Sequence, residues 1–303
     1  MSTSTGSTAQ NVPSSEIEQA RSHLRELSLK NVEPAGDPSC PVCRGLGFHF
    51  DPSAVRNDRG GFEICECIRG TTRCDGKFPY EYYDAESNAI LPCPTRPARM
   101  ALDKIAIIEA KAGIPPRYRH KFLEYVEFHP GEPGGMFWAL DHAAHTLKDF
   151  PLPDERRGLY IHGQTGSGKT LLSCVLLNEI IRLYRVPVKY AKISRDVLGK
   201  LRSSFNPNSP SYGEGQKIEE ELGKVPALVV DDFGIHKDTD WVNSVLYDLI
   251  DSRYENNLLT ILTSNEPLDA WQDVFGGRLY SRMKSMCAEI HIEAPDYRLN
   301  EHQ

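Results

Sequence analysis

A glycine-rich stretch of the chain ends in a lysine followed by a threonine. It fits the pattern G-x-x-x-x-G-K-[ST] at every defined position, with Gly163, Gln164, Thr165, Gly166, Ser167, Gly168, Lys169 and Thr170. In such a loop the glycines let backbone N–H groups curl around phosphates, and the lysine places its charge beside the β- and γ-phosphates. The threonine hydroxyl can ligate Mg²⁺. We therefore predict that these residues bind ATP and Mg²⁺, and that Lys169 also acts in catalysis.

Two consecutive carboxylates follow an apolar run further along the chain. Residues 227–230 read Ala-Leu-Val-Val and precede Asp231 and Asp232. This pattern predicts a buried parallel strand whose tip carries both acids. We expect Asp231 to bind Mg²⁺ and Asp232 to take a proton from the attacking water. Many P-loop ATPases have Glu at the second position, so a purely structural role for Asp232 stays open.

A further buried strand that ends in polar residues is expected at the apolar residues 258–262, which precede Thr263, Ser264 and Asn265. A polar side chain beside the metal-binding strand is well placed to orient water or to sense the γ-phosphate. Asn265 is therefore our third catalytic candidate. The alternative is that Thr-Ser-Asn only ends the strand in a turn.

Four cysteines in two close pairs have the spacing of a zinc site. Cys40 and Cys43 are separated from Cys65 and Cys67 by 21 residues. Zn²⁺ prefers four soft ligands in a tetrahedron, and each close pair supplies two thiolates from one side. Because C-x-C is less usual than C-x-x-C, a member of the second pair could be replaced by one of three nearby residues: Cys74, Cys93 or His49. The alternative is a set of buried free cysteines, the role we expect for Cys174 and Cys287.

These residues need elements that position them. The apolar residues 159–161 before the loop and 171–184 after it predict a strand, a loop and a long helix. Residues 31–97 are Cys- and Gly-rich with little periodicity, and a Pro-rich stretch at 91–99 marks the expected boundary. We thus expect three parts: disordered residues with a short helix at 1–30, a zinc module at 31–97 and an α/β domain at 98–303.

Composition limits the possible partners. The formal net charge of the 303 residues is −7. Any contact with nucleic acid must therefore come from a local cluster of basic residues rather than from the electrostatic field of the whole protein. No stretch approaches the roughly 18 apolar residues of a membrane span, and the first residues lack a secretory signal. We expect a cytoplasmic protein with no membrane partner.

A local basic stretch precedes the acidic strand. Lys192, Arg195, Lys200 and Arg202 are accompanied by one acid, Asp196, up to residue 204. A basic helix of this kind is suited to track a single nucleic-acid strand. The alternative is an ordinary solvated helix face.

Several segments together resemble a known family. These are AGIPPRYRHKFLEY (112–125), GQTGSGKTLLS (163–173), KVPALVVDDFG (224–234), LYDLIDSRYENNLLTILTSN (246–265) and GGRLYSRM with EIHIEAPDYR (276–298). In this order they look like the DnaC/DnaI helicase loaders and their relative IstB, a transposition helper ATPase. The resemblance implies an AAA+ domain, which is a P-loop fold with a parallel five-stranded sheet flanked by helices. It also implies ATP held at a boundary between subunits.

The resemblance further implies an arginine that reaches the γ-phosphate on a neighbouring copy. Arg282 matches that position, and Arg278, one helical turn earlier, is the alternate. Only 21 residues follow Arg282, which is too few for the helical lid of larger AAA+ machines. Family members of this short type also lack the lid, and Arg298 in the terminal DYR is a candidate for part of its contacts.

The family context implies an ATPase that loads the replicative hexameric DNA helicase onto single-stranded DNA and associates with itself through ATP-bridged interfaces. The alternative is an IstB-like transposition helper that acts on duplex DNA with a transposase. A third possibility is an accessory adaptor with little turnover. The Cys-rich module favours the loader, because some DnaI-like loaders carry a comparable amino-terminal module.

Overall fold

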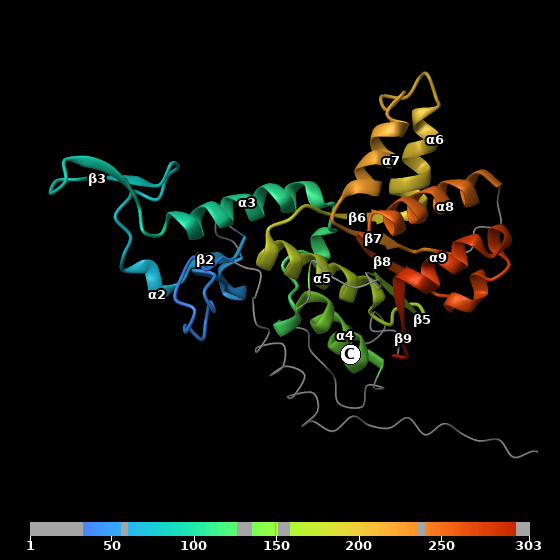
Figure 1. The fold of residues 1–303 in the computed structure, drawn as a ribbon, viewed down its shortest axis with the longest axis horizontal. Helices are drawn as coiled ribbons and strands as arrows, with labels where there is room; N and C mark the ends of the chain where they lie inside the picture. The colour runs from blue at the N-terminus through green and yellow to red at the C-terminus, as the bar shows by residue number, and fades with distance from the viewer. Residues whose placement is uncertain are drawn as a thin grey trace, which may run out of the picture. The chain divides into compact units, whose positions relative to one another are not determined.

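The computed structural model describes residues 33–55, 60–125, 135–148, 150, 158–234 and 240–294 (Figure 1). The described residues divide into two compact units, one formed by 33–111 with 180–186 and the other by 112–179 with 187–294. The helix α3 (Arg96–Ala112) spans the expected boundary at 97/98, and its residues up to 111 belong to the first unit. The expected division into independently folding domains stays a prediction. The segment 1–30 and Arg298 lie outside the described residues.

The first unit is built from short elements. Strands β1 (Phe48–Phe50) and β2 (Phe62–Ile64) pair antiparallel, and helix α2 (Glu66–Arg69) follows them. Strands β3 (Glu81–Asp84) and β4 (Ala89–Pro92) form a separate antiparallel hairpin before α3. The β1–β2 pair is held by edge-to-face contacts of Phe62 with Phe48 and Phe50, at ring-centroid distances of 5.9 and 5.6 Å. Strands of three residues bury little surface by themselves, so this part needs another source of stability.

The second unit contains a five-stranded sheet in the order β6-β7-β8-β5-β9, and every pair in it is parallel. Its strands are β5 (Gly158–Gly163), β6 (Val188–Lys192), β7 (Ala227–Asp231), β8 (Leu259–Ser264) and β9 (Cys287–Ile292). The expected parallel sheet flanked by helices is confirmed. Strand β8 lies between β5 and β7, and the carboxyl ends of all three meet at one edge.

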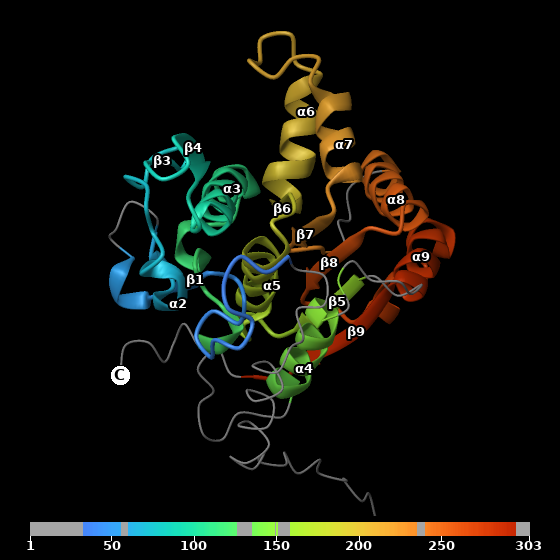
Figure 2. The same ribbon diagram turned by 60° about the vertical axis from the view of Figure 1, so that its left-hand side comes forward.

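Helices surround this sheet in Figure 2. They are α4 (Gly135–Lys148), α5 (Lys169–Tyr184), a π-helical segment (Ile193–Gly199), α6 (Lys200–Ser204), α7 (Gly215–Lys224), α8 (Asp240–Glu255) and α9 (Arg278–Met286). Apolar residues of one sheet face, such as Leu228 and Val230, pack with buried residues of α6 to α9. Helix α5 lies on the side of the sheet away from α8 and α9 in Figures 1 and 2. Strand β9 is the last described element.

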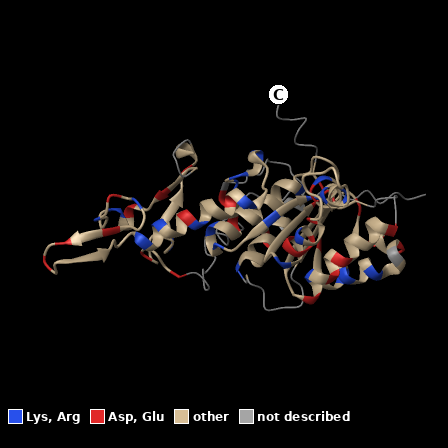
Figure 3. Ribbon diagram, turned by 90° about the horizontal axis from the view of Figure 1, so that it is seen from above, with Lys and Arg blue, Asp and Glu red and all other residues tan. Residues whose placement is uncertain are grey.

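The charge distribution agrees with the sequence. Lysines and arginines are interspersed with acidic residues along the described elements (Figure 3). Among the described residues, no helix has both the length and the apolar character needed to cross a membrane. The expected basic helix begins only at Ile193, because Lys192 is the last residue of strand β6.

Candidate functional site

The glycine-rich loop joins β5 to the first residue of α5. Gly166 and Gly168 have φ angles of 81° and 94°, a region that side chains with a Cβ rarely adopt. At Gly163 a Cβ would lie 2.2 Å from the carbonyl oxygen of Ile292, so a larger residue would clash with strand β9. The glycines therefore permit a turn that directs the amino end of α5 toward the loop, as an anion site requires.

Two polar groups in the loop fit a phosphate ligand. The Lys169 side chain is buried, and its Nζ donates to the carbonyl oxygens of Gly163 at 2.8 Å and Gln164 at 2.6 Å. The Oγ of Ser167 is buried and has no hydrogen-bond partner among the described residues. A buried hydroxyl without a partner is costly, and a phosphate oxygen in the loop would satisfy it.

Three hydroxyl groups converge on Asp231 at the tip of β7. Oδ1 accepts from Thr170 Oγ1 at 2.8 Å and from Thr263 Oγ1 at 2.7 Å, while Oδ2 accepts from Tyr190 at 2.6 Å. Asp231 is 1% exposed, and burial raises the pKa of Tyr190 well above its ordinary value. The loop threonine and the strand acid expected to share Mg²⁺ therefore lie in direct contact. Their oxygen donors fit that ion.

The next acid lies in a different environment. Asp232 has a φ of 58°, its backbone N–H donates to Thr263 Oγ1 at 3.1 Å, and its side chain is 59% exposed. Its Oδ2 forms an ion pair with Lys192 Nζ at 2.7 Å. Asn265 follows β8 and is exposed. The sheet therefore carries all three predicted strand-tip residues at one edge, while their catalytic roles stay predictions.

The four predicted zinc ligands come together in the first unit. The Sγ atoms of Cys40, Cys43, Cys65 and Cys67 all lie within 4.8 Å of one another. Cys40 and Cys65 are 3.7 Å apart, and Cys43 and Cys67 are 3.5 Å apart. A tetrahedral Zn²⁺ with Zn–S bonds of about 2.3 Å places its sulfurs about 3.8 Å from one another. The cluster could hold a metal of this size.

Backbone groups prepare the cluster for thiolates. The N–H groups of Cys43 and Val42 lower the pKa of Cys40 to about 7, whereas burial raises the pKa of Cys43 to about 12. The turn that brings these groups in uses Gly45 and Gly47, with φ angles of 89° and 73°. Burial thus opposes ionisation of the Cys43 thiol, and a bound cation would stabilise its thiolate form.

The alternative ligands are not part of this cluster. Cys93 contacts Thr95 Oγ1 at 3.2 Å and the backbone N–H of Arg73 at 3.3 Å, and it also contacts Cys74. His49 lies on β1, outside the group of four sulfurs. Cys174 and Cys287 are buried within the second unit, which confirms that they are packing residues.

Comparison with known proteins identifies the family. A family model described as "IstB-like ATP binding protein" matches residues 140–303, which is more than half of the chain. The chain belongs to the IstB-like ATP-binding family. The match covers the described sheet and the whole nucleotide site, so this IstB-like protein carries the P-loop fold that its loop sequence predicts.

Its relatives include a helicase loader and an insertion sequence protein. The replicative helicase loader DnaI of Bacillus subtilis is 25% identical over 176 residues, covering 52% of this chain and 53% of that protein. The putative insertion sequence ATP-binding protein y4pL of Sinorhizobium fredii is 28% identical over 130 residues, covering 42% and 49%. The IstB-like chain thus spans about half the length of the curated relatives it matches.

A solved structure has the same fold. The crystal structure of the DnaC helicase loader superposes with a TM-score of 0.50 at 22% identity, over 59% of this chain and 100% of that one. The AAA+ architecture implied by the sequence segments is therefore confirmed. At 22% identity, this similarity shows a shared fold alone.

One of the segments that resemble the family has a structural explanation. The helix α8 ends in Ser-Arg-Tyr, and Arg253 within it is fully buried. Its guanidinium donates to Thr260 Oγ1 and to the carbonyl oxygens of Leu222, Val225 and Leu259, at 2.6 to 2.9 Å. Arg253 thereby ties α7 and α8 to strand β8, and burial lowers its pKa to about 9.

Both arginine candidates lie on α9 of the IstB-like protein. Arg282 is held within its own chain by Asp251, with Nε and Oδ1 2.5 Å apart, and its guanidinium lies over the Tyr254 ring at 4.7 Å. Arg278 is exposed and forms no ion pair within the part of the chain that the structure describes. A role for either arginine in a neighbouring copy stays a prediction.

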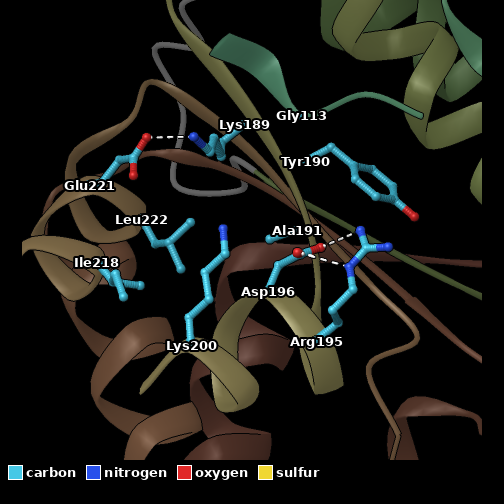
Figure 4. A pocket seen from close by; sticks show the side chains of 10 residues that line it. All are labelled: Gly113, Lys189, Tyr190, Ala191, Arg195, Asp196, Lys200, Ile218, Glu221 and Leu222. Carbon is cyan, nitrogen blue, oxygen red and sulfur yellow. Dashed lines mark hydrogen bonds and ion pairs between the residues drawn. The ribbon is translucent and has the colours of Figure 1, made fainter. Parts of the chain in front are cut away.

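Arg195 and Lys200 of the basic stretch line a pocket beside strand β6 (Figure 4). Arg195 binds Asp196 at 2.8 Å, and Lys189 binds Glu221 at 2.5 Å. Lys200 extends between Asp196 and Leu222 in the same view. Two lysines, one arginine and two acidic side chains thus line this pocket.

Sequence reasoning missed three participants in the nucleotide site. Tyr190 and Lys192 belong to β6, and Thr263 belongs to β8; all three contact Asp231 or Asp232. Tyr190 alternates with lysines along β6, so it could have been read as a side chain facing the core. No spacing rule linked these positions to the acids, because the contacts depend on which strands are neighbours.

Proposed function

We propose that this protein hydrolyses ATP to load a replicative DNA helicase onto single-stranded DNA. The observation that carries the proposal is the presence, in one chain, of a nucleotide site on an AAA+ sheet and a four-cysteine cluster in a separate unit. The DnaI and DnaC relatives support this function. The first site would supply the energy and the second unit would hold the helicase.

The chemistry begins with binding of the triphosphate. The loop amides and Lys169 bind its phosphates, and Thr170 and Asp231 hold the accompanying Mg²⁺. When bound, Mg²⁺ would neutralise negative charge on the phosphates as the reaction proceeds. Asp232 accepts the proton of the attacking water, and Asn265 orients that water. The water oxygen forms a bond to the γ-phosphorus, the bond from this phosphorus to the bridging oxygen breaks, and ADP leaves with that oxygen while inorganic phosphate is formed.

A neighbouring copy completes the site. The guanidinium of Arg282 from one copy stabilises the transferring phosphoryl group on the next, and Arg278 is the alternate. In the isolated chain Arg282 is bound to Asp251. Assembly would therefore exchange that carboxylate for a phosphate, which suits a side chain that is 36% exposed.

Single-stranded DNA binds along the basic stretch. Lys200 and Arg202 provide its cations, and Arg202 is held over the Trp241 ring at 5.4 Å. Exchanging Lys200 and Arg202 for glutamate should weaken single-strand binding without changing nucleotide affinity, since neither residue contacts the loop. Unchanged retention on single-stranded DNA would remove this assignment.

The cysteine unit binds Zn²⁺ through Cys40, Cys43, Cys65 and Cys67 and contacts the hexameric helicase. Zinc supplies a fixed tetrahedral centre there and takes no part in catalysis. Cys65 precedes α2 and Cys67 lies within it, so the metal centre would fix the position of this helix. Helicase contact should therefore disappear when the metal is removed.

A second function is favoured by a specific observation. The matching family model is that of IstB-like proteins, and two relatives are described as insertion sequence ATP-binding proteins. In this case the ATPase would act on duplex DNA together with a transposase. The nucleotide chemistry would be the same, while the partner and the DNA would differ.

The deciding experiment is capture and loading with purified components. The full chain is mixed with the replicative helicase of its host or with the transposase of a neighbouring insertion sequence, and helicase transfer to a circular single strand is measured. ATP-dependent transfer by the wild-type chain, lost in Cys40→Ser/Cys67→Ser and kept in Cys74→Ser, supports loading. Capture of the transposase alone overturns it.

A further inference from the structure

Two cysteines of the first unit lie together outside the four-sulfur cluster. Cys74 lies in the loop between α2 and β3, and Cys93 directly follows β4. Both are free thiols, and the Cys74 side chain donates to the Cys93 sulfur. Within the described ranges, these two thiols do not belong to any group of three or more possible metal ligands. Two thiols in contact without a further ligand are suited to redox chemistry rather than to metal binding.

We propose that Cys74 and Cys93 form a reversible disulfide when the protein reacts with a peroxide, with the Cys93 sulfur as the attacking nucleophile. Cys74 then resolves the oxidised Cys93 sulfur. This modification site goes beyond the proposed function, since the reaction requires neither ATP nor DNA.

Hydrogen-bond donors surround the Cys93 sulfur. The backbone N–H of Arg73 donates to it at 3.3 Å. The Thr95 hydroxyl lies 3.2 Å from the same sulfur and accepts from Arg99 Nε at 3.1 Å. Thr95 is fully buried, so its own hydrogen needs a buried acceptor, and the sulfur lies within reach. The cation of Arg99 thus acts on Cys93 through the Thr95 hydroxyl.

These donors favour the ionised form of the sulfur. Burial opposes ionisation of Cys93, but the surrounding hydrogen bonds outweigh it and lower the pKa of the thiol to about 6. Most Cys93 side chains are therefore thiolates at neutral pH, and the thiolate is the nucleophile in cysteine chemistry. Cys174 and Cys287 in the second unit differ, because burial raises the pKa of both thiols. The same chain therefore contains two unreactive thiols for comparison.

The loop that carries Cys74 lies against the same arginine. This loop turns at Gly76, where φ is 80° and a Cβ would lie 3.2 Å from Arg99 Nη1. Cys74 is partly exposed, whereas Cys93 is buried. A molecule as small as hydrogen peroxide can therefore approach the pair at Cys74, while the buried sulfur is shielded from larger reagents.

The reaction balances with hydrogen peroxide as the oxidant. The Cys93 thiolate attacks one peroxide oxygen, the O–O bond breaks, and hydroxide leaves while Cys93 becomes a sulfenic acid. The Cys74 thiol gives its proton to this hydroxide, which becomes water. The Cys74 thiolate then attacks the Cys93 sulfur, the S–O bond breaks, and a second hydroxide leaves. Two electrons have passed from the sulfurs to the peroxide, and a thiol reductant reverses the disulfide.

The bond would enclose the hairpin β3–β4, because both of its strands lie between the two cysteines in the sequence. A cross-link of this kind restricts the unfolded chain. The oxidised hairpin should therefore resist proteolysis more than the reduced one.

The first test maps cysteine pairing in the full chain. The wild type is treated with a small excess of hydrogen peroxide in the presence of Zn²⁺, free thiols are blocked, and tryptic peptides are identified by mass spectrometry. Trypsin cleaves after Lys77, so a bond between Cys74 and Cys93 joins two separate peptides. We expect this bond to form first and to disappear with dithiothreitol, while Cys174 and Cys287 stay reduced. A first disulfide between other cysteines, or no disulfide at all, would overturn the proposal.

Single variants separate the two roles. Cys74→Ser should stop the reaction at the sulfenic acid of Cys93, which dimedone captures. Cys93→Ser should leave Cys74 largely reduced at the same peroxide concentration. If the remaining thiol reacts equally fast in the two variants, Cys93 is not the nucleophile and the proposal is wrong.

A third test removes the hydroxyl that supports the thiolate. The rate of sulfenic acid formation is measured against pH in Cys74→Ser and in Cys74→Ser/Thr95→Val. The midpoint should lie near pH 6 in the first and about one pH unit higher in the second, because the thiolate loses a donor. Thr71→Val removes a hydroxyl that donates to the carbonyl oxygen of Ile68, and in the same background it should leave the midpoint unchanged. Equal midpoints with and without the Thr95 hydroxyl would contradict its role.

Discussion

The nucleotide site and the cysteine cluster obtain their geometry from different sources. Asp231 and Thr170 meet although they lie 61 residues apart, because a parallel sheet with a large apolar core holds their strands and helix in place. The cysteine pairs meet across 24 to 25 residues, between three-residue strands and a four-residue helix. The first site is positioned by a large sheet and its core, whereas the second lies among short elements, some of whose residues are buried, and would depend more on its own ligands.

The difference predicts how each region fails. Loss of one contact in the nucleotide site should impair chemistry while the sheet survives, since many buried residues support it. Loss of one ligand in the cysteine cluster should unfold its surroundings, since metal binding there is also folding energy. The following substitutions test that contrast, beginning with the largest effect.

Removing a cysteine ligand should have the greatest consequence. Cys43→Ser breaks the tetrahedral set, and we expect loss of the metal and of the roughly 10 kcal/mol that a structural zinc contributes. Metal content by mass spectrometry under native conditions and protease resistance of residues 33–93 measure the effect. Cys74→Ser is the control, and ATP affinity should be kept in both variants. A Cys43→Ser chain that retains one bound metal would show that the cluster is not the site.

Removing the loop lysine should impair chemistry and leave the fold intact. Lys169→Ala deletes the cation beside the phosphates, and we expect turnover to fall about 100- to 1,000-fold, as for the loss of a catalytic donor. Steady-state ATP hydrolysis and thermal unfolding are measured together. Lys224→Ala, at an exposed position on α7, should retain full activity. Full activity of Lys169→Ala would exclude this loop as the catalytic site.

A substitution at Arg253 tests how much stability the sheet loses when one buried side chain is changed. Arg253→Met removes donors from three buried carbonyl groups, and we expect destabilisation by about 3 kcal/mol. Denaturant unfolding of the second unit reports the loss, and metal content of the cysteine unit should stay normal. Arg253→Lys should be intermediate, because lysine keeps a charge but cannot reach all four acceptors. If Arg253→Met is as stable as the wild type, Arg253 does not stabilise the packing of α7 and α8 against strand β8.

Thr263 should show the smallest effect on stability. Thr263→Val removes one hydroxyl that donates to Asp231 and accepts from Asp232, which we expect to cost about 1 to 2 kcal/mol. Chemical denaturation measures this cost, and ATP turnover should decline because both acids lose a support. Thr146→Val on α4 removes a local helix contact and serves as the control. Equal losses of stability and of ATP turnover in the two variants would show that the Thr263 hydroxyl at the end of β8 does not support the two acids.

The loop and the acidic strand could be predicted from the sequence because each follows a local rule, whereas the five-stranded parallel sheet was implied by the family resemblance. Glycine spacing indicates the loop, and an apolar run followed by acids indicates a strand tip. The four cysteines were also identified by spacing, and their sulfurs lie together. Residues 193–204 could be predicted as helical from their pattern, but the start of the helix after Lys192 could not.

Contacts between strands were not accessible in the same way. Tyr190, Lys192 and Thr263 gain their roles from the order β6-β7-β8 in the sheet, and no local pattern encodes which strands become neighbours. The pairing of Arg282 with Asp251 likewise depends on α8 packing beside α9. The segments that form these helices were singled out only by the family resemblance, and their contacts with each other required the fold.

The central claim is that ATP is hydrolysed between two copies of the chain. It is tested most directly by mixing Lys169→Ala with Arg282→Ala and measuring ATP hydrolysis on single-stranded DNA. Each variant alone should be inactive, and the mixture should recover part of the wild-type rate, because a mixed interface combines an intact loop with an intact arginine. If Arg282→Ala and Arg278→Ala each hydrolyse ATP at the wild-type rate regardless of dilution, the account is contradicted.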